Sequence, residues 1–335
     1  MMKAFQLNGT AQAEEKPLEL VDLPVPEPGP GQVRLKIKLC GVCHTDLHTI
    51  EGDIHPPHMP VVPGHQVVAT IDKLGEGVEQ VKVGDRVGVP WLYDADGTCE
   101  YCRRGLENLC PNARFTGFHM DGGYAEYMLA EAAYVLPLPD SLTDGQAAPL
   151  LCAGIIGYRS LRQADLQKGE RLGLFGFGAS AHLAIQVARH WDCEVYAFTR
   201  SQAHRDLAMD LGAAWAGGSE DKPPKPLDRA VIFAPVGEIV PQALAKLRPA
   251  GTLAINAIHM SAIPQMPYEL VYGERTLRSV ANATYQDGVE FLELGAEIPI
   301  VSTVQMYAFE DASQALIDLK HSRINGEAVL QIEKQ

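Results

Sequence analysis

Residues 41–48, which read Gly-Val-Cys-His-Thr-Asp-Leu-His, concentrate side chains that bind metals and move protons. A thiol, two imidazoles, a hydroxyl and a carboxylate occur within these eight positions. Zinc takes Cys and His ligands, and a catalytic zinc keeps one coordination position open for water or substrate. The segment alone only suggests such a site, and its significance depends on residues 63–66 and 151–154 further along the chain.

Two of those later residues complete a candidate ligand set for one zinc ion. Cys43, His65 and Cys152 would supply two thiolates and one imidazole, which leaves the fourth tetrahedral position free. A zinc-bound alcohol can lose its proton near neutral pH, and the alkoxide is the species that releases hydride. Taken singly, His65 is more typical of a turn and Cys152 of an apolar core. The prediction therefore rests on the three residues together with a dinucleotide site.

The polar neighbours of Cys43 predict the other parts of this site. Asp46 is placed to accept the second ring N–H of a ligating histidine, a common arrangement around zinc. Thr45 and His48 would carry the alcohol proton to solvent, with His48 as the general base.

A second group of cysteines indicates a structural zinc. Cys99 and Cys102 form a C-x-x-C step, and Cys110 follows downstream. A closed site needs a fourth ligand, and Asp96 stands one such step before Cys99, where its carboxylate would complete a Cys3Asp set. The alternative is that this lobe binds no metal and that Asp96 is a solvated loop residue.

The chain also carries a dinucleotide-binding pattern, Gly176-x-Gly178-x-x-Ala181, between an apolar strand at 171–175 and a helical stretch at 182–191. The first glycine permits a tight turn, the second lets the backbone approach a pyrophosphate, and the small third residue lets helix and sheet pack closely. The phosphates would lie on N–H groups at the helix N-terminus.

The end of the next strand predicts which nicotinamide cofactor binds. An NAD-type site normally offers Asp or Glu to the ribose hydroxyls about 20 residues after the glycines. This chain has Thr199 and Arg200 there, with no carboxylate to repel a 2′-phosphate and with an arginine able to pair with one. The pattern favours NADP(H) over NAD(H), unless Arg200 is only a solvated surface charge.

Composition argues against several other classes of function. The 335 residues make two domains more simply than one, and 46% hydrophobic content is typical of a globular chain. The net charge of −14 argues against a nucleic-acid or anionic-membrane surface. We expect a cytoplasmic protein, because the sequence shows no signal peptide and no apolar run long enough to span a bilayer. Seven cysteines, an odd number, favour metal or thiol chemistry over a disulfide framework.

Two kinds of sequence pattern divide the chain. The first 140 residues or so are mostly β in character, with a Pro/Gly-rich connector at 24–31 and strands expected at 33–39, 67–71 and 81–89. From about residue 145 strands alternate with helices, which specifies a parallel sheet with crossover helices. We expect buried strands at 194–199, 230–234, 252–257 and 277–280, and helices at 201–211 and 240–247.

With these residues the chain resembles the zinc-dependent alcohol dehydrogenases of the medium-chain dehydrogenase/reductase family over essentially its whole length. The most specific segments are 43–48, 63–65, 121–127, 152–154 and 176–178. The resemblance implies an α/β plus β fold, with a GroES-like, mostly-β catalytic domain (1–145 and 286–335) and a Rossmann coenzyme domain (146–285). It also implies zinc ligands at Cys43, His65 and Cys152, a proton relay at Thr45 and His48, and a pyrophosphate contact at His44.

Four positions depart from the family pattern. Gln66 replaces a near-zinc glutamate, and Asp96 replaces the first structural-zinc cysteine. Residues 155–156 replace a Thr-containing stretch, and Glu327 lies where many members place a phosphate-binding arginine. None removes the chemistry, but together they bear on substrate range and cofactor affinity. The walls of the substrate pocket would come from around Trp91, Phe115 and 258–260.

The sequence therefore predicts reversible hydride transfer between a primary or secondary alcohol and NAD(P), in a dimer or tetramer as in related enzymes. A zinc-free quinone or enone reductase on the same architecture is one alternative, which insensitivity to a strong chelator would favour. A non-enzymatic nucleotide- or redox-sensing protein is another, which would bind the cofactor without oxidising any alcohol.

Overall fold

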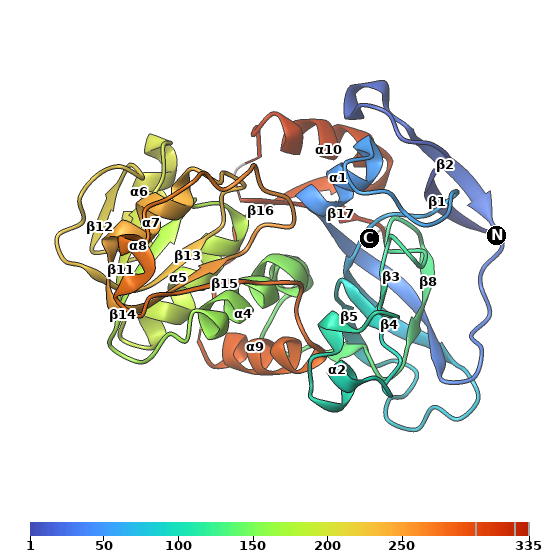
Figure 1. Cartoon of the computed structure of the whole chain (residues 1–335). Helices are drawn as coiled ribbons and strands as arrows, with labels where there is room; N and C mark the ends of the chain where they lie inside the picture. The colour runs from blue at the N-terminus through green and yellow to red at the C-terminus, as the bar shows by residue number, and fades with distance from the viewer. Residues whose placement is uncertain (299, 325, 334–335) are drawn as a thin grey trace. The chain divides into compact units, whose positions relative to one another are not determined.

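The computed structural model describes residues 1–298, 300–324 and 326–333, and the chain divides into two units, whose elements are labelled in Figure 1. Unit 1 comprises residues 1–152, 282–297 and 301–335, and unit 2 comprises residues 153–281 and 298–300. The break at 152/153 lies within a π-helical turn, Leu150–Gly154, a few residues beyond the boundary expected from the sequence pattern.

A seven-stranded, mostly antiparallel sheet forms the centre of unit 1. Its order is β16-β17-β3-β4-β5-β9, and β8 also pairs with β3. The alternation predicted for the strand before Cys43 is confirmed, because Leu35 and Ile37 are buried in the core while Lys36 between them is exposed. The strands are β3 (Gln32–Val42), β4 (Gln66–Leu74), β5 (Arg86–Val89), β8 (Tyr127–Glu131), β9 (Leu136–Pro137), β16 (Val304–Ala308) and β17 (Glu327–Gln331).

Smaller elements complete unit 1. Two short antiparallel pairs join β1 to β2 and β6 to β7. Helix α1 begins directly where β3 ends, and it stops at Gly52, whose φ of 84° favours glycine. The bounds are β1 (Met2–Leu7), β2 (Leu18–Leu23), β6 (Leu92–Asp94), β7 (Arg114–Phe115), α1 (His44–Glu51), α2 (Glu100–Arg103), α3 (Asp144–Pro149), α9 (Tyr285–Glu297) and α10 (Ala312–Lys320).

Unit 2 is a six-stranded parallel sheet with crossover helices. The order β12-β11-β10-β13-β14-β15 shows that the chain starts in the middle at β10, reaches one edge at β12, and returns to β13 to build the other half. In such doubly wound sheets ligands bind at this reversal, outside the carboxyl ends of the strands. The elements are β10 (Arg171–Phe175), β11 (Glu194–Phe198), β12 (Trp215–Gly217), β13 (Leu227–Ile232), β14 (Leu247–Ile255), β15 (Thr276–Ser279), α4 (Ile155–Gln163), α5 (Ala179–His190), α6 (Gln202–Asp210), α7 (Ile239–Lys246) and α8 (Glu269–Tyr272).

The predicted fold class, a mostly-β domain with a doubly wound parallel sheet, is confirmed. Two strand predictions are corrected. β15 lies at the edge of the sheet beside β14 and all four of its residues are exposed, so the expectation of a buried strand at 277–280 is wrong except at Val280, which is buried. Of the segment 81–89, only the second half forms a strand, β5. In the first half, Gly84 has a φ of 92° and the Asp85 carboxylate accepts a hydrogen bond from the Lys82 N–H, which makes a turn. Among the described residues, no helix is long and apolar enough to cross a membrane.

Candidate functional site

Three segments of unit 1 bring Cys43, His65 and Cys152 together. Cys43 caps the N-terminus of α1, His65 immediately precedes β4, and Cys152 lies in the π-helical turn. Ligand atoms of the three residues all lie within 4.8 Å of one another, and Cys43 Sγ is 3.3 Å from His65 Nε2. Ligands of a tetrahedral zinc are ~3.5–3.8 Å apart, given Zn–S and Zn–N bonds of ~2.3 and ~2.0 Å. The arrangement and the soft donor set therefore fit a zinc ion.

Asp46 fixes the orientation of the His65 ring. His65 Nδ1 donates to Asp46 Oδ1 over 3.0 Å, and both side chains are buried. This bond assigns the proton to Nδ1 and leaves Nε2 facing Cys43. Asp46 also accepts hydrogen bonds from the backbone N–H groups of Cys43 (3.0 Å) and Gly64 (3.2 Å). One buried carboxylate thus ties the start of α1 to the segment before β4.

The electrostatics of the trio suit a cation. The Cys152 thiol hydrogen-bonds to Cys43 and, with the His65 imidazole, holds the pKa of the Cys43 thiol well below its usual value despite burial. The same contact with Cys43, followed by burial, raises the pKa of Cys152 well above its usual value. Burial lowers the pKa of His65, but Asp46 and Cys43 outweigh it and hold that pKa well above its usual value. A bound metal would displace protons from Cys152 and His65, as thiolate and imidazole ligation requires.

The two residues predicted as a proton relay lie on α1. Thr45 and His48 are three positions apart and therefore share a face of the helix. The Thr45 N–H donates to Cys43 Sγ over 3.3 Å, which sets this residue beside a candidate ligand. His48 Nδ1 lies 2.7 Å from Asp53 Oδ2, which leaves its Nε2 for proton exchange. No hydrogen bond joins Thr45 to His48 in the described residues, and His44 is exposed on the same helix.

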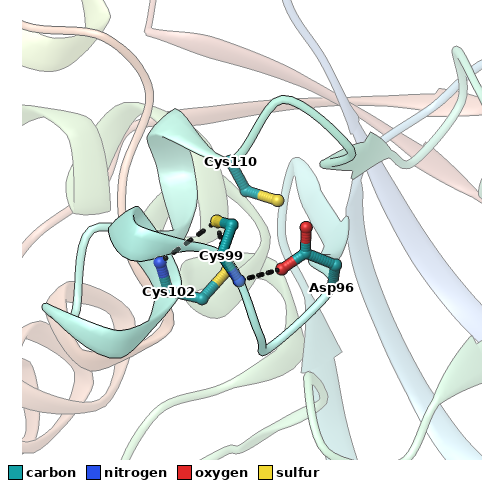
Figure 2. Close-up of side chains that lie close together, drawn as sticks. All are labelled: Asp96, Cys99, Cys102 and Cys110. Atoms are coloured by element: carbon teal, nitrogen blue, oxygen red, sulfur yellow. Dashed lines mark hydrogen bonds between the residues drawn. The ribbon is translucent and has the colours of Figure 1, made fainter.

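The second cluster also assembles (Figure 2). Ligand atoms of Asp96, Cys99, Cys102 and Cys110 all lie within 4.8 Å of one another. Asp96 Oδ1 accepts from the N–H groups of Thr98 and Cys99, both at 2.9 Å, so the carboxylate is held toward the thiols. Cys99 Sγ is 3.5 Å from Cys102 Sγ. Three thiols and one carboxylate form a complete four-ligand set of the kind that closed zinc sites use.

The charges in this cluster favour the same reading. Hydrogen bonds from Cys99 N–H, Asn112 and Thr98 N–H hold the pKa of Asp96 well below its usual range, so it is ionised at neutral pH. The N–H of Cys102 lowers the pKa of Cys99. Burial and then the neighbouring Cys99 raise the pKa of Cys102 to about 12. A cation among these four residues would relieve the mutual repulsion of thiolates and carboxylate.

In unit 2 the glycine pattern forms the predicted strand–turn–helix. Gly176 follows β10 with a φ of 87°, and an added Cβ would lie 2.9 Å from Ala234 N, so only glycine fits. Gly178 is the N-cap of α5, no side chain caps the helix there, and an added Cβ would meet nothing within 4 Å. No side chain and no nearby atom therefore crowds the start of α5 at Gly178, which suits the approach of a phosphate to the helix N-terminus. Ala181 is fully buried, which lets the helix pack closely.

The end of β11 carries more cationic charge than the sequence pattern indicated. Thr199 is 8% exposed, and Arg200 beside it is exposed. Arg205 Nε donates to the Thr199 carbonyl over 2.9 Å, which brings a second guanidinium to this end of the strand. Arg205 is not among the residues predicted from the sequence, although its place one turn into α6 is a usable signal. His182 in α5 is 5% exposed, and its Nε2 has no partner among the described residues.

Aromatic rings adjoin the candidate zinc ligands. The Trp91 ring meets the His65 ring edge-on at 4.9 Å between centroids, and Phe115 stacks on Trp91 at 5.1 Å. Phe118, which sequence reasoning missed, contacts Trp91 at 5.7 Å. These rings are half-buried rather than part of the hydrophobic core of unit 1, as expected of residues that face a small molecule.

Comparison with known proteins finds matches over most of the chain. Residues 29–140 match the family model described as alcohol dehydrogenase GroES-like domain, and residues 181–297 match that described as zinc-binding dehydrogenase. A probable alcohol dehydrogenase, AdhA, of Mycobacterium tuberculosis is 45% identical over 99% of this chain and 97% of its own length. An alcohol dehydrogenase of Geobacillus stearothermophilus is 35% identical over 96% of this chain and 97% of its own length. The solved structure of the cinnamyl alcohol dehydrogenase SbCAD4 of Sorghum bicolor aligns with a TM-score of 0.90 at 27% identity, over 100% of this chain and 99% of that one.

Proposed function

The chain belongs to the medium-chain dehydrogenase/reductase family and is an alcohol dehydrogenase of that family, and on this premise we propose that it uses zinc to transfer hydride reversibly between a primary or secondary alcohol and a nicotinamide dinucleotide. The observation that carries the proposal is the convergence of Cys43, His65 and Cys152 from three distant segments, with His65 oriented by the buried Asp46. Three protein ligands leave one position for the substrate oxygen.

The residues of the site would divide the work of binding. Cys43, Cys152 and His65 would hold the ion, and Asp46 would keep His65 in the tautomer whose Nε2 is free. When bound, zinc supplies Lewis acidity toward the substrate oxygen, and the nicotinamide accepts or donates the hydride. The half-buried rings of Trp91 and Phe115 would exclude water and contact the apolar part of the substrate.

Thr45 and His48 would move the proton that the alcohol loses. The hydroxyl of Thr45, whose backbone N–H bonds to Cys43 Sγ, would accept it at Oγ1 and release its own. His48 would take a proton at Nε2, because Asp53 accepts the hydrogen bond from Nδ1. Its partial exposure lets it pass the proton to solvent.

The glycine loop of unit 2 would bind the cofactor. The pyrophosphate would lie on the N–H groups at the start of α5, where no side chain caps the helix at Gly178. Arg200 and Arg205 at the end of β11 would attract a 2′-phosphate, since no carboxylate stands at 199–201 to repel it. NADP(H) is therefore the cofactor we propose, ahead of NAD(H).

Replacement of Cys43 tests the proposed function. Cys43→Ala should remove about one zinc per chain and lower kcat/KM for alcohol oxidation by at least ~1,000-fold, because one ligand and its charge are lost. Cys40→Ala is the matched control, since Cys40 is a buried thiol three positions away that joins neither cluster. Unchanged activity in Cys43→Ala would overturn the proposal. Activity that survives complete chelation would favour a zinc-free quinone or enone reductase.

Replacement of Arg200 tests the cofactor assignment. Arg200→Ala should lower kcat/KM for NADPH about tenfold and leave that for NADH within a factor of two, because NADH has no 2′-phosphate to lose a partner. Lys168→Ala is the control, since Lys168 is an exposed cation of unit 2 that pairs with Asp192. A wild-type enzyme with a large preference for NADH would refute the assignment.

We also propose that the protein forms a homodimer or homotetramer. β15 is an exposed edge of the six-stranded sheet, and Leu277 on it is 39% exposed. Tyr268 and Tyr272 nearby in the sequence are 69% and 73% exposed. An uncovered edge with apolar side chains is suited to pairing with a second copy. The molar mass in solution, measured by light scattering, tests this, and a monomer at micromolar concentration would refute it.

A further inference from the structure

β17 begins with a carboxylate that is almost completely buried. Glu327 is 4% exposed, and its Oε1 has no hydrogen-bond partner among the residues that the structure describes. Its backbone N–H donates to the Thr303 carbonyl over 2.9 Å, so the main chain is fixed at this point. A buried carboxylate oxygen without a partner is costly, and each such atom in a folded protein calls for an explanation. The proton relay and the ligand trio do not use it.

The register of the sheet puts Glu327 on the same face as Cys43. Gly41 pairs with Val329, and residues two apart in a strand share a face. Glu327 lies two residues before Val329 on the antiparallel strand. Cys43 lies two residues after Gly41 and keeps an extended backbone, with φ −130° and ψ 173°. The carboxylate and the thiol therefore project from neighbouring strands, at the end of the sheet where the candidate zinc ligands gather.

Gln66 is a second buried polar side chain on this face. It pairs with Gly41 from the other side, on β4, and is fully buried. Its Nε2 and Oε1 have no partner in the described part of the chain. A Cβ added at Gly41 would lie 2.5 Å from Gln66 Oε1, so the amide lies over that glycine. Position 41 thus puts no side chain between the amide and β17.

We propose that Glu327 is a positioning residue for the catalytic metal. Its carboxylate faces the ion from outside the ligand trio, and its negative charge helps to retain the ion. The inference rests on the proposed function, because it requires the ion that Cys43, His65 and Cys152 would hold. Electrostatics agrees with the register: burial and then Cys43 raise the pKa of Glu327 to about 8, while His65 acts in the opposite direction. Because Cys43 and His65 both act electrostatically on this buried carboxylate, a divalent cation held by them would also act on it and would favour its ionised form.

The rate at which the holoprotein releases zinc to an excess of a chromogenic chelator tests this proposal without measuring catalysis. Two zinc sites would release their ions in two kinetic phases. The phase that is absent from the Cys43→Ala variant belongs to the catalytic site. Glu327→Gln keeps the shape of the side chain and removes its charge, and we expect that phase to become at least about tenfold faster, equivalent to ~1.4 kcal/mol. Glu333→Gln is the control, because Glu333 follows β17 on the surface and pairs with Lys36 at 2.7 Å. Its release should equal that of the wild type.

A rescue variant separates charge from packing. The double variant Gln66→Glu/Glu327→Gln moves the carboxylate from β17 to β4, on the other side of Gly41 but on the same face of the sheet. In this variant the rate of zinc release should return to within about threefold of the wild-type rate. Glu327→Asp, which keeps the charge, should release zinc more slowly than Glu327→Gln. Wild-type release from Glu327→Gln, or equal release from the Asp and Gln variants, would overturn the inference alone. A wild-type protein that holds no zinc through Cys43 would instead overturn the proposed function.

Discussion

His65 Nδ1 and Asp46 Oδ1 lie 3.0 Å apart in a fully enclosed hydrogen bond, with the two side chains 0% and 2% exposed. Asp46 belongs to the first turn of α1, whereas His65 lies in the segment immediately before β4. The same carboxylate accepts hydrogen bonds from the backbone N–H groups of Cys43 and Gly64. The position of the imidazole therefore depends on a single acceptor that serves both segments.

Asp46→Asn should weaken zinc binding at this site by about 10- to 100-fold, because the amide has one acceptor oxygen where the carboxylate has two. The NH2 of the new amide would face one of the N–H groups from which the Asp46 carboxylate now accepts a hydrogen bond, so two donors would meet. Zinc affinity, measured by competition with a chelator, checks this. Asp22→Asn is the control, since Asp22 pairs with Lys3 at an exposed position, and equal affinities in the two variants would contradict the role given to Asp46.

Asp96→Ala should lower the zinc content from about two to about one per chain, because a closed structural site needs all four ligands. Asp96→Cys should keep about two, since a thiolate suits zinc at least as well. Metal analysis of the purified variants measures both. Glu100→Ala, at the start of α2 in the same lobe, is the control. A wild-type content of about one would show that the Asp96 cluster binds no zinc.

Alanine at each glycine of the dinucleotide loop should separate stability from binding. Gly176→Ala should destabilise unit 2 by ~1–2 kcal/mol or more, because its φ of 87° strains an L side chain and the new methyl would approach Ala234 N. Gly178→Ala should leave stability nearly unchanged, since its φ is −104° and no atom lies near the added Cβ, yet it should weaken cofactor binding. Thermal unfolding and cofactor titration measure the two effects. The reverse pattern would contradict this reading of the loop.

Asp228 should make the stability of unit 2 depend on acid pH. Burial raises the pKa of Asp228, but hydrogen bonds from Arg171 and Arg248 outweigh it and hold that pKa at about 2. Because the folded pKa lies below the unfolded value of about 3.9, the stabilisation is complete above pH ~4 and is lost as the pH falls through about 2. Asp228→Asn should therefore cost ~2 kcal/mol at pH 7 and almost nothing below pH 2.

Urea unfolding followed by the fluorescence of Trp191 and Trp215, both in unit 2, measures that difference at each pH. Asp206→Asn, on the exposed face of α6, serves as the control. If Asp228→Asn lowers the free energy of unfolding by the same amount from pH 7 to pH 2, the ionisation of Asp228 contributes nothing to stability.

Local sequence patterns were sufficient for the parts of the molecule that are contiguous in the chain. The strand before Cys43 and the strand–glycine–helix segment at 171–190 both formed as predicted, because alternation and glycine spacing act on neighbouring residues. The types of residue at 43–48 and 96–110 by themselves likewise indicate zinc chemistry. The exposure of β15 had no such signal, because an edge strand and a central strand carry the same local propensities.

What the sequence determined by itself is therefore which side chains are chemically able to bind zinc and phosphate, and how the nearest elements present them. The tertiary structure alone decided which of those side chains meet. Glu327 faces Cys43 through the antiparallel register of β17 on β3, and Gln66 lies over Gly41 through the pairing of β3 with β4. Cross-strand pairing joins residues that are distant in the chain, and no short-range pattern encodes which strand lies beside which.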